Sequence, residues 1–175
     1  VYAWDNDGEI KIDFSTTGYS FNTSTGIAEK AGDGSRVLVG MVRTNSSSQF
    51  DDSAVKRNVA SWHNRRKRAL RNTFTTDRAV TNGANQEINS EIRVQLLTWV
   101  EDDVEATFNF RVNMAGTGDF ATAAPSFNGV EPTEKVGGNA YTGNADIGAA
   151  PTDRVTLSEG FHYITAWAFA NGGTS

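Results

Sequence analysis

Apolar and polar residues alternate over long stretches of this chain, which is the pattern of strands that bury one face. Within residues 104–114 every second residue is apolar, and the residues between them are polar or charged. This period of two predicts a half-buried strand. Residues 92–96 alternate in the same way, and the acidic residues 101–103 give a turn signal between the two segments. The stretch from Glu91 to Met114 is therefore predicted to be an antiparallel hairpin.

Near the carboxyl end, the alternation combines aromatic with small residues. Large and small side chains alternate over residues 161–169, which favours a strand that is buried on both faces, deep in a sheet. Two further strands are predicted at residues 9–14 and 36–44, the first of them after the turn signal Asn6-Asp7-Gly8. Glycine, asparagine and proline punctuate residues 115–153, where loops and short strands are expected.

The chain contains no long segment with helical periodicity, so we predict an all-β fold. The arrangement expected of these strands is an antiparallel β-sandwich of the jelly-roll type. The residues expected in its core are Ile92, Val94, Leu96, Phe108, Phe110, Val112, Tyr163 and Trp167.

The composition agrees with strands joined by polar turns. The hydrophobic fraction is 38% and the mean hydropathy is -0.45, and Gly, Asn, Thr and Ser account for the low value. Ten Phe, four Tyr and four Trp argue against disorder. A chain of 175 residues is expected to form a single domain. Its expected parts are N-terminal strands or an arm at residues 1–35, core strands at 36–114, a loop-rich segment at 115–153 and a C-terminal strand at 154–175.

Cysteine is absent, which excludes disulfide bonds and thiolate metal sites. No apolar stretch approaches the length that crosses a bilayer, so membrane insertion is not expected. The chain begins at Val1 rather than at Met. We therefore expect it to be one module of a longer protein.

The stretch SWHNRRKRALRNTF, residues 61–74, concentrates positive charge in a chain whose net charge is -5. A helix would place Arg66 on its apolar stripe and would contain several asparagines, which are weak helix formers, so strands are favoured over a helix. Nucleic-acid binding is not expected, because the sequence pI is about 5.0. The cations are Arg65, Arg66, Lys67, Arg68 and Arg71.

Two roles are open for these cations. We expect them to pair with carboxylates, including those of a neighbouring subunit. The alternative is contact with an anionic glycan or a phosphate-bearing surface.

Residues able to carry enzymatic chemistry are few. His63 and His162 are the histidines, and no Ser/His/Asp arrangement, paired-histidine metal spacing or phosphate-binding loop is recognisable. His162 alternates with aromatic residues, so it is expected to be a packed side chain. The acidic residues 5–9 and 101–103 are interpreted as turns, with calcium binding as the weaker alternative. We expect no enzymatic activity, no metal and no cofactor.

One loop has the composition of a contact surface. Tyr141 lies in the stretch GGNAYTGNAD and offers a ring on which a sugar can stack. Neighbouring amides and a carboxylate suit the hydroxyl groups of a sugar. A binding role is therefore predicted for Asn139, Tyr141, Asn144 and Asp146, and the alternative is that Tyr141 packs back onto the sheet.

The order of four phrases resembles a family of tail-fibre and other host-attachment virion proteins of tailed bacteriophages. The resemblance runs from about Arg36 to Phe169 and has no catalytic signature. The phrases are RVLVGMVRTNSSSQF, VASWHNRRKRAL, EINSEIRVQLLTWVED and VTLSEGFHYITAWAF.

This resemblance implies a component of the virion surface that binds other virion proteins and forms a homotrimer of β-sandwiches. Trimerisation would add buried surface to a chain of modest hydrophobicity and would let a basic strand meet acidic turns of a neighbour. The implied function is attachment to a bacterial surface glycan or protein. A purely structural virion module, such as a capsid decoration or a fibre-assembly domain, is the alternative.

Overall fold

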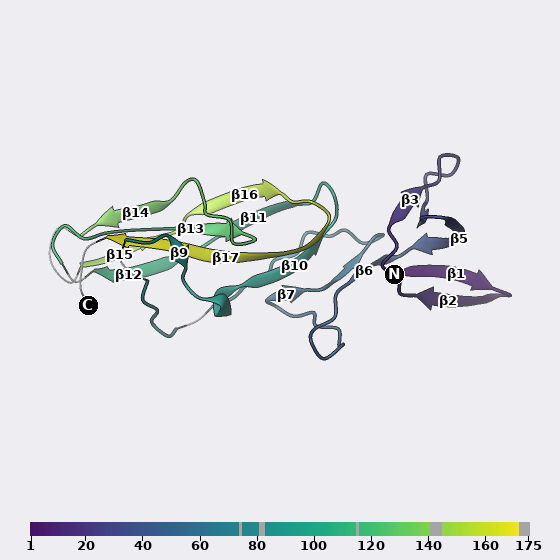
Figure 1. Ribbon diagram of the computed structural model, residues 1–175, viewed down its shortest axis with the longest axis horizontal. Helices are drawn as coiled ribbons and strands as arrows, with labels where there is room; N and C mark the ends of the chain where they lie inside the picture. The colour runs from purple at the N-terminus through teal and green to yellow at the C-terminus, as the bar shows by residue number, and fades with distance from the viewer. Residues whose placement is uncertain (74, 81–82, 115, 141–144, 172–175) are drawn as a thin grey trace. The chain divides into compact units, whose positions relative to one another are not determined.

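The structure is a computed structural model and shows an all-β chain (Figure 1). It describes residues 1–73, 75–80, 83–114, 116–140 and 145–171. Helical structure among these residues is limited to one 3-10 turn, η1 (Ser90–Ile92). The prediction of an all-β fold is confirmed.

The chain divides into two compact units. Unit 1 comprises residues 1–53 and 57–69, and unit 2 comprises residues 54–56 and 70–175. The units are defined by their internal contacts and not by independent folding. The single domain with its four expected parts therefore stays a prediction.

Unit 1 is built on a five-stranded antiparallel sheet with the strand order β2-β1-β5-β4-β3. A separate antiparallel pair joins β6 to β8. The strands are β1 (Tyr2–Asn6), β2 (Glu9–Asp13), β3 (Tyr19–Phe21), β4 (Ala28–Lys30), β5 (Asp33–Leu38), β6 (Gly40–Val42) and β8 (Val59–Ser61). The strands predicted at residues 9–14 and 36–44 are thus present, the second of them interrupted at Val39.

The turn between β1 and β2 forms where the sequence predicts it. Asp7 and Gly8 have φ angles of 55° and 88°, and positive φ at both central residues is what a two-residue type I′ hairpin turn requires. The carboxylate of Asp5 accepts a hydrogen bond from the Gly8 N–H at 2.7 Å. The short polar side chains of this stretch therefore stabilise the turn.

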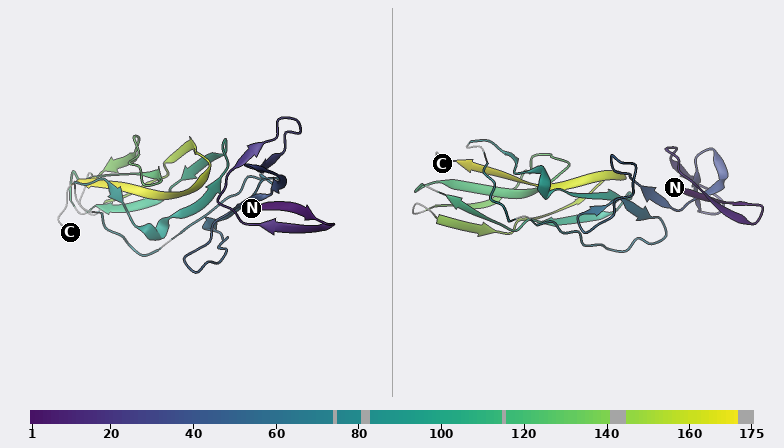
Figure 2. Two further views of the ribbon diagram at one scale, coloured as in Figure 1. Left: turned by 45° about the vertical axis from the view of Figure 1, so that its right-hand side comes forward. Right: turned by 90° about the horizontal axis from the view of Figure 1, so that it is seen from below.

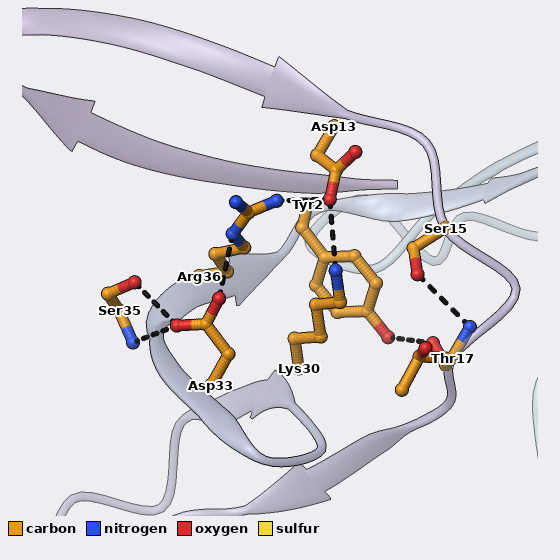
Figure 3. A network of polar contacts seen from close by, with 8 residues as sticks. All are labelled: Tyr2, Asp13, Ser15, Thr17, Lys30, Asp33, Ser35 and Arg36. Atoms are coloured by element: carbon orange, nitrogen blue, oxygen red, sulfur yellow. Dashed lines mark hydrogen bonds and ion pairs between the residues drawn. The ribbon is translucent and has the colours of Figure 1, made fainter.

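One face of the unit 1 sheet carries a polar network around Asp13 (Figure 3). Tyr2 is buried on this face, and its hydroxyl donates a hydrogen bond to the Thr17 carbonyl at 2.7 Å. Asp13 accepts from Lys30 at 3.1 Å and also pairs with Arg36. These contacts, first the hydrogen bond from Lys30, lower the pKa of Asp13 below its ordinary value.

Unit 2 contains a larger antiparallel sheet with the order β14-β13-β17-β10-β7, in which β9 also pairs with β17. Its strands are β7 (Lys56–Arg57), β9 (Gln86–Glu87), β10 (Val94–Thr98), β13 (Phe120–Phe127), β14 (Val136–Asn139) and β17 (Gly160–Asn171). As predicted from its aromatic and small residues, the C-terminal strand β17 lies inside the sheet, between β13 and β10.

Two short strand pairs form a second layer in unit 2. They join β11 (Asp103–Thr107) to β16 (Thr152–Thr156) and β12 (Phe110–Met114) to β15 (Ala145–Ala149). Met114 of β12 packs in a buried cluster with Ala121 of β13 and Ala140, and Val112 and Ile147 pack against this cluster. Figure 2 shows these pairs lying along the larger sheet. Unit 2 is therefore sandwich-like.

The hairpin predicted from Glu91 to Met114 is wrong. β10 pairs with β17, and the alternating segment after it breaks at residues 108–109 into β11 and β12, which pair with β16 and β15. Alternation identifies the inward face of a strand, but it does not specify the partner strand.

Residues 115–153, where loops and short strands are predicted, contain the short strands β14 and β15, but residues 120–127 form the eight-residue strand β13, which is longer than predicted. Ala124 lies opposite Trp167 and Thr122 lies opposite Phe169, whereas Ala121 and Ala123 lie opposite alanines of β17. Small residues are weak strand formers in isolation, but Ala124 and Thr122 leave room for the two aromatic side chains across the sheet.

The predicted core is only partly correct. Leu96 is buried, whereas the other predicted core residues are half-buried. The deepest side chain is Trp99, with 0% of its surface exposed, and Leu97 and Thr98 are buried beside it. The second layer of unit 2 consists of two short strand pairs. It covers the inward side chains of the larger sheet only in part, so residues that are assigned to the inward face correctly are still half-buried. The half-buried members are Ile92, Val94, Phe108, Phe110, Val112, Tyr163 and Trp167.

Candidate functional site

The predicted cations lie in an irregular segment that follows β8. The described residues from Trp62 to Asn85 form neither a strand nor a helix, so the strand prediction for this stretch is wrong. The Ser61 hydroxyl accepts hydrogen bonds from the N–H groups of His63 and Asn64, at 3.3 and 3.2 Å. This turn ends β8. We call residues 65–68 the basic segment.

Arg65 begins the basic segment and stacks on an aromatic cluster. Its guanidinium carbon lies 4.1 Å from the centroid of the Trp62 ring. The Trp62 ring in turn contacts Tyr19 and Phe21, with centroid distances of 5.3 and 5.9 Å. Tyr19 and Phe21 meet edge to face at 5.6 Å. These four residues form the aromatic–arginine cluster.

The strands of unit 1 position this cluster. Tyr19 and Phe21 are two residues apart on β3, the last strand of its sheet, so their side chains share a face. The Trp62 N–H donates to the Val39 carbonyl at 3.0 Å, which holds the residue after β8 close to the chain between β5 and β6. The cluster remains accessible, because 56% of Phe21 is exposed and Trp62 is only half-buried.

The basic segment contrasts with other cations of unit 1. Lys11 pairs with Glu9, and Lys30 and Arg36 share Asp13. Arg66, Lys67 and Arg68 are exposed.

Within the described ranges of the chain, the side chains of Arg66, Lys67 and Arg68 form neither an ion pair nor a hydrogen bond. Arg71 is also exposed and belongs to unit 2, where its backbone N–H donates to the Ala54 carbonyl at 2.8 Å. The expected pairing with carboxylates of a neighbouring subunit stays a prediction.

The loop predicted to bind sugar is described only in part. Tyr141 and Asn144 lie outside the described residues. Asn139 ends β14 with an exposed side chain, and Asp146 lies on β15, where its carboxylate accepts from Arg111 at 2.5 Å and from Asn113 at 3.1 Å.

These two contacts, first the hydrogen bond from Asn113, lower the pKa of Asp146 below its ordinary value. The carboxylate therefore joins β15 to β12.

His162 is a packed histidine, as predicted. It is buried on β17, where Nε2 donates to the Ser158 carbonyl at 2.8 Å and Nδ1 accepts from the Asn128 amide at 2.9 Å. These two partners favour the tautomer that carries its hydrogen on Nε2. His63 is exposed beside the basic segment. No group of three or more His, Asp or Glu side chains in the described residues could hold a metal ion.

The acidic stretches are turns, as predicted. In the first, Asp5 accepts from Gly8 and Glu9 pairs with Lys11. In the second, Asp102 accepts from the Trp99 N–H at 2.9 Å.

Asp103 follows that second turn and pairs with Arg154 across β11 and β16. The carboxylates therefore stabilise the local structure. None of the described helices is long and apolar enough to span a membrane.

Two features of unit 1 were not predicted from the sequence. One is the contribution of Tyr19 and Phe21 to the cluster, which the alternating aromatics of GYSFN could have indicated. The other is an exposed apolar face formed by Ile10, Ile12, Phe14 and Phe50. Ile10 and Ile12 are 73% and 61% exposed, and the rings of Phe14 and Phe50 are 6.1 Å apart. The alternation of residues 9–14 predicts burial of this face, yet within this chain it is open.

The aromatic–arginine cluster and the exposed apolar face lie on opposite faces of the unit 1 sheet. Asp13 contacts Lys30, and Lys30 lies opposite Tyr19 in the strand register. Ile12 precedes Asp13 on β2 and therefore points to the other face. Unit 1 can thus contact one partner through rings and cations and another through aliphatic side chains. No protein family, curated protein or solved structure was found to match this chain.

Proposed function

We propose that this chain is part of a virion surface protein of a tailed bacteriophage, such as a tail fibre, and attaches the particle to its host. It acts by non-covalent recognition of a bacterial surface glycan or protein. The aromatic–arginine cluster is the observation that carries this proposal. The assignment to a phage protein rests on the order of the four sequence phrases, from RVLVGMVRTNSSSQF to VTLSEGFHYITAWAF, which resembles that family.

The cluster has the chemistry of a recognition surface. Aromatic rings give a rigid contact area with few rotatable bonds, and arginine gives directional donors, so both residue types are favoured where proteins bind partners. Trp62 contacts the rings of Tyr19 and Phe21, and the Arg65 guanidinium lies over its ring. A side chain held in this way loses little conformational entropy when a ligand binds.

We also propose that the chain assembles as a homotrimer of jelly-roll-like sandwiches, together with other virion proteins. The exposed apolar face supports this part of the proposal. Exposed clusters of large aliphatic and aromatic side chains usually mark a contact with another protein surface. Ile10, Ile12, Phe14 and Phe50 would be covered by a neighbouring subunit.

A purely structural virion module is the second candidate. The exposed apolar face favours it, because burying this face would be enough to explain a role in assembly. Under this alternative, the aromatic–arginine cluster would contact a neighbouring subunit and no host molecule. Neither candidate function includes enzymatic activity.

Adsorption to bacteria distinguishes the two candidates. The fluorescently labelled chain would be incubated with a panel of Gram-negative and Gram-positive cells, and bound fluorescence would be measured after washing. For an attachment module we expect adsorption to some strains, strong loss with Trp62→Ala and partial retention with Trp62→Phe. Adsorption to no strain, by a chain that assembles normally, would support the structural module.

The predicted loop gives a rival site for the same assay. Replacing Tyr141 and Asn144 together by alanine should leave adsorption unchanged if the aromatic–arginine cluster binds the host. Loss of adsorption with this pair, and retention with Trp62→Ala, would move the site to residues 139–146.

A further inference from the structure

We infer that the aromatic–arginine cluster and the basic segment together bind a saccharide chain that carries carboxylate or phosphate groups. This inference rests on the proposed attachment function and names the class of its ligand. Two properties of the surface carry it independently. One is the set of accessible rings, and the other is positive charge that the described carboxylates do not neutralise.

The rings provide the contact for sugar. A pyranose has apolar C–H faces that stack on aromatic rings, which suits a shallow and accessible aromatic surface. Phe21 is more than half exposed, and Trp62 lies within 6 Å of both Tyr19 and Phe21, measured between ring centroids. The three rings come from β3 and from the residue after β8, so the sheet holds them in place.

The cations provide the contact for anionic groups. Lys30 and Arg36 pair with Asp13 and Asp33, whereas Arg66, Lys67 and Arg68 meet no carboxylate among the described residues. Neighbouring exposed cations repel one another, and an anion bound from solution relieves that repulsion. Arg65 connects the two contacts, because it belongs to the basic segment and stacks on Trp62.

The charge of the whole chain favours an anionic saccharide over nucleic acid. The net charge is -5 although the basic segment contributes four cations, so the remainder of the chain repels a densely charged polymer. A saccharide with one anionic group per repeat is less densely charged and also presents apolar faces to the rings. A protein partner is better suited to the exposed apolar face, on the opposite side of the sheet.

Binding of defined polymers tests this inference. The purified full chain would be titrated with polygalacturonate for carboxylate, with poly(ribitol phosphate) teichoic acid for phosphate, with neutral dextran and with an oligo(dT) strand. We expect one of the two anionic polysaccharides to bind, the neutral one not to bind, and oligo(dT) to bind more weakly. The preferred anionic polymer identifies the charged group.

A charge-neutral variant and a matched control locate the site. The variant Arg66→Gln/Lys67→Gln/Arg68→Gln should bind the preferred polysaccharide roughly tenfold more weakly, because three exposed charge contacts are lost. The control Arg111→Gln/Lys135→Gln/Arg154→Gln removes the same charge from unit 2 and should bind as the unchanged chain does. Melting temperatures of both variants report whether they fold.

The salt dependence of binding is a second test, which needs no variant. Binding of the preferred polysaccharide to the unchanged chain should weaken as the salt concentration rises.

Four results would overturn the inference: no binding to either anionic polysaccharide, equal binding to dextran, tighter binding to oligo(dT), or equal weakening by the unit 2 control. The proposed attachment function fails separately, through absence of adsorption to cells. If cells adsorb the chain and the triple variant adsorbs equally well, the attachment function stands and the anionic ligand is rejected.

Discussion

Arg65 stacks on Trp62, three residues before it in the chain, with its guanidinium carbon 4.1 Å from the ring centroid. The contact combines a positive charge with a planar group that matches the ring, which a lysine ammonium does not reproduce. Stacking also places Arg65 at the junction between the rings and the basic segment.

The first prediction separates this geometry from the charge. Arg65→Lys keeps the positive charge but loses the planar stack, which at an exposed site is worth about 0.5–1 kcal/mol. We therefore expect adsorption affinity to fall roughly two- to fivefold, with a melting temperature lowered by no more than about 4 °C. Arg154→Lys, on β16 of unit 2, is the matched control and should bind normally. Equal affinity of the Arg65→Lys variant and the unchanged chain would show that stacking does not contribute.

The second prediction concerns the close approach of β14 to β13. A Cβ atom at Gly137 would lie 1.9 Å from the Ala121 carbonyl oxygen, whereas one at Gly148 on β15 would meet its nearest neighbour at 3.6 Å. Gly137→Ala should destabilise the chain by about 2 kcal/mol or more, because the backbone of β14 must move. Gly148→Ala should change stability by less than about 1 kcal/mol. Urea unfolding of the two variants measures the difference, and equal stabilities would contradict the strand pairing.

The third prediction is a pH dependence centred on Glu87. The carboxylate accepts from Arg93 at 2.7 and 2.6 Å and from Thr165 at 2.5 Å, and these contacts, the Arg93 hydrogen bond first, lower the pKa of Glu87 below its ordinary value of 4.5. A lowered pKa in the folded chain means that the stabilisation is present above the ordinary value and is lost as the pH falls below it. The unfolding free energy should therefore decrease on acidification below about pH 5.

Glu87→Gln tests this assignment. The variant should be about 1–3 kcal/mol less stable at neutral pH, because the hydrogen bonds lose their charge, and its stability should depend less on pH in the acidic range. Unfolding in urea at a series of pH values gives both quantities. Parallel pH curves for the variant and the unchanged chain would rule out Glu87 as the group responsible.

The fourth prediction compares two aromatic residues of unit 2. Trp99 is fully buried, whereas Phe110 is half-buried and stacks on Phe108 with a centroid distance of 5.5 Å. Trp99→Ala should cost about 3–5 kcal/mol, since it leaves a large cavity. Phe110→Ala should cost only about 1–2 kcal/mol, less than the value for a fully buried ring. Chemical unfolding provides the measurement, and a larger loss for Phe110→Ala would contradict the position of the core.

The sequence predicts the features of this fold that depend on neighbouring residues. Alternation identifies the strands within residues 104–114 and 161–169. The short polar residues and glycine of Asn6-Asp7-Gly8 predict the turn, in which Asp7 and Gly8 have positive φ. Strand pairing is different, because Leu96 of β10 lies opposite His162 of β17, far away in the chain. Nothing in the local pattern around Leu96 specifies that partner.

The candidate site shows the same limit. The cations of the basic segment are evident in the sequence, but the irregular conformation of that segment is not. Trp62 meets Tyr19 and Phe21 only because β8, β6 and the five-stranded sheet bring distant residues together. Strand β13 was missed because its small residues are weak strand formers by themselves, and its pairing with β17, which lies far away in the chain, is not evident from the local pattern.

The last prediction concerns the exposed apolar face. Ile10 and Ile12 lie on β2, the edge strand of the unit 1 sheet, and Ile12 lies opposite Ala3, which in turn lies opposite Val37. If this face joins subunits, Ile10→Thr with Ile12→Thr should weaken the trimer without unfolding the sheet, because threonine is also β-branched and suits a strand.

Light scattering of the full chain at micromolar concentration measures this assembly. The unchanged chain is expected to be a trimer that added salt weakens only modestly, because apolar contacts dominate and exposed ion pairs are screened. The Ile10→Thr/Ile12→Thr variant is expected to be monomeric, with the circular dichroism spectrum of the unchanged chain. Val130→Thr with Val136→Thr alters two exposed aliphatic residues of unit 2 and should remain trimeric. A trimer that survives the loss of both isoleucines would remove this face from the interface. A monomer before any substitution would overturn the trimer itself and leave the basic segment without a neighbouring subunit to contact, which favours an anionic ligand for its cations.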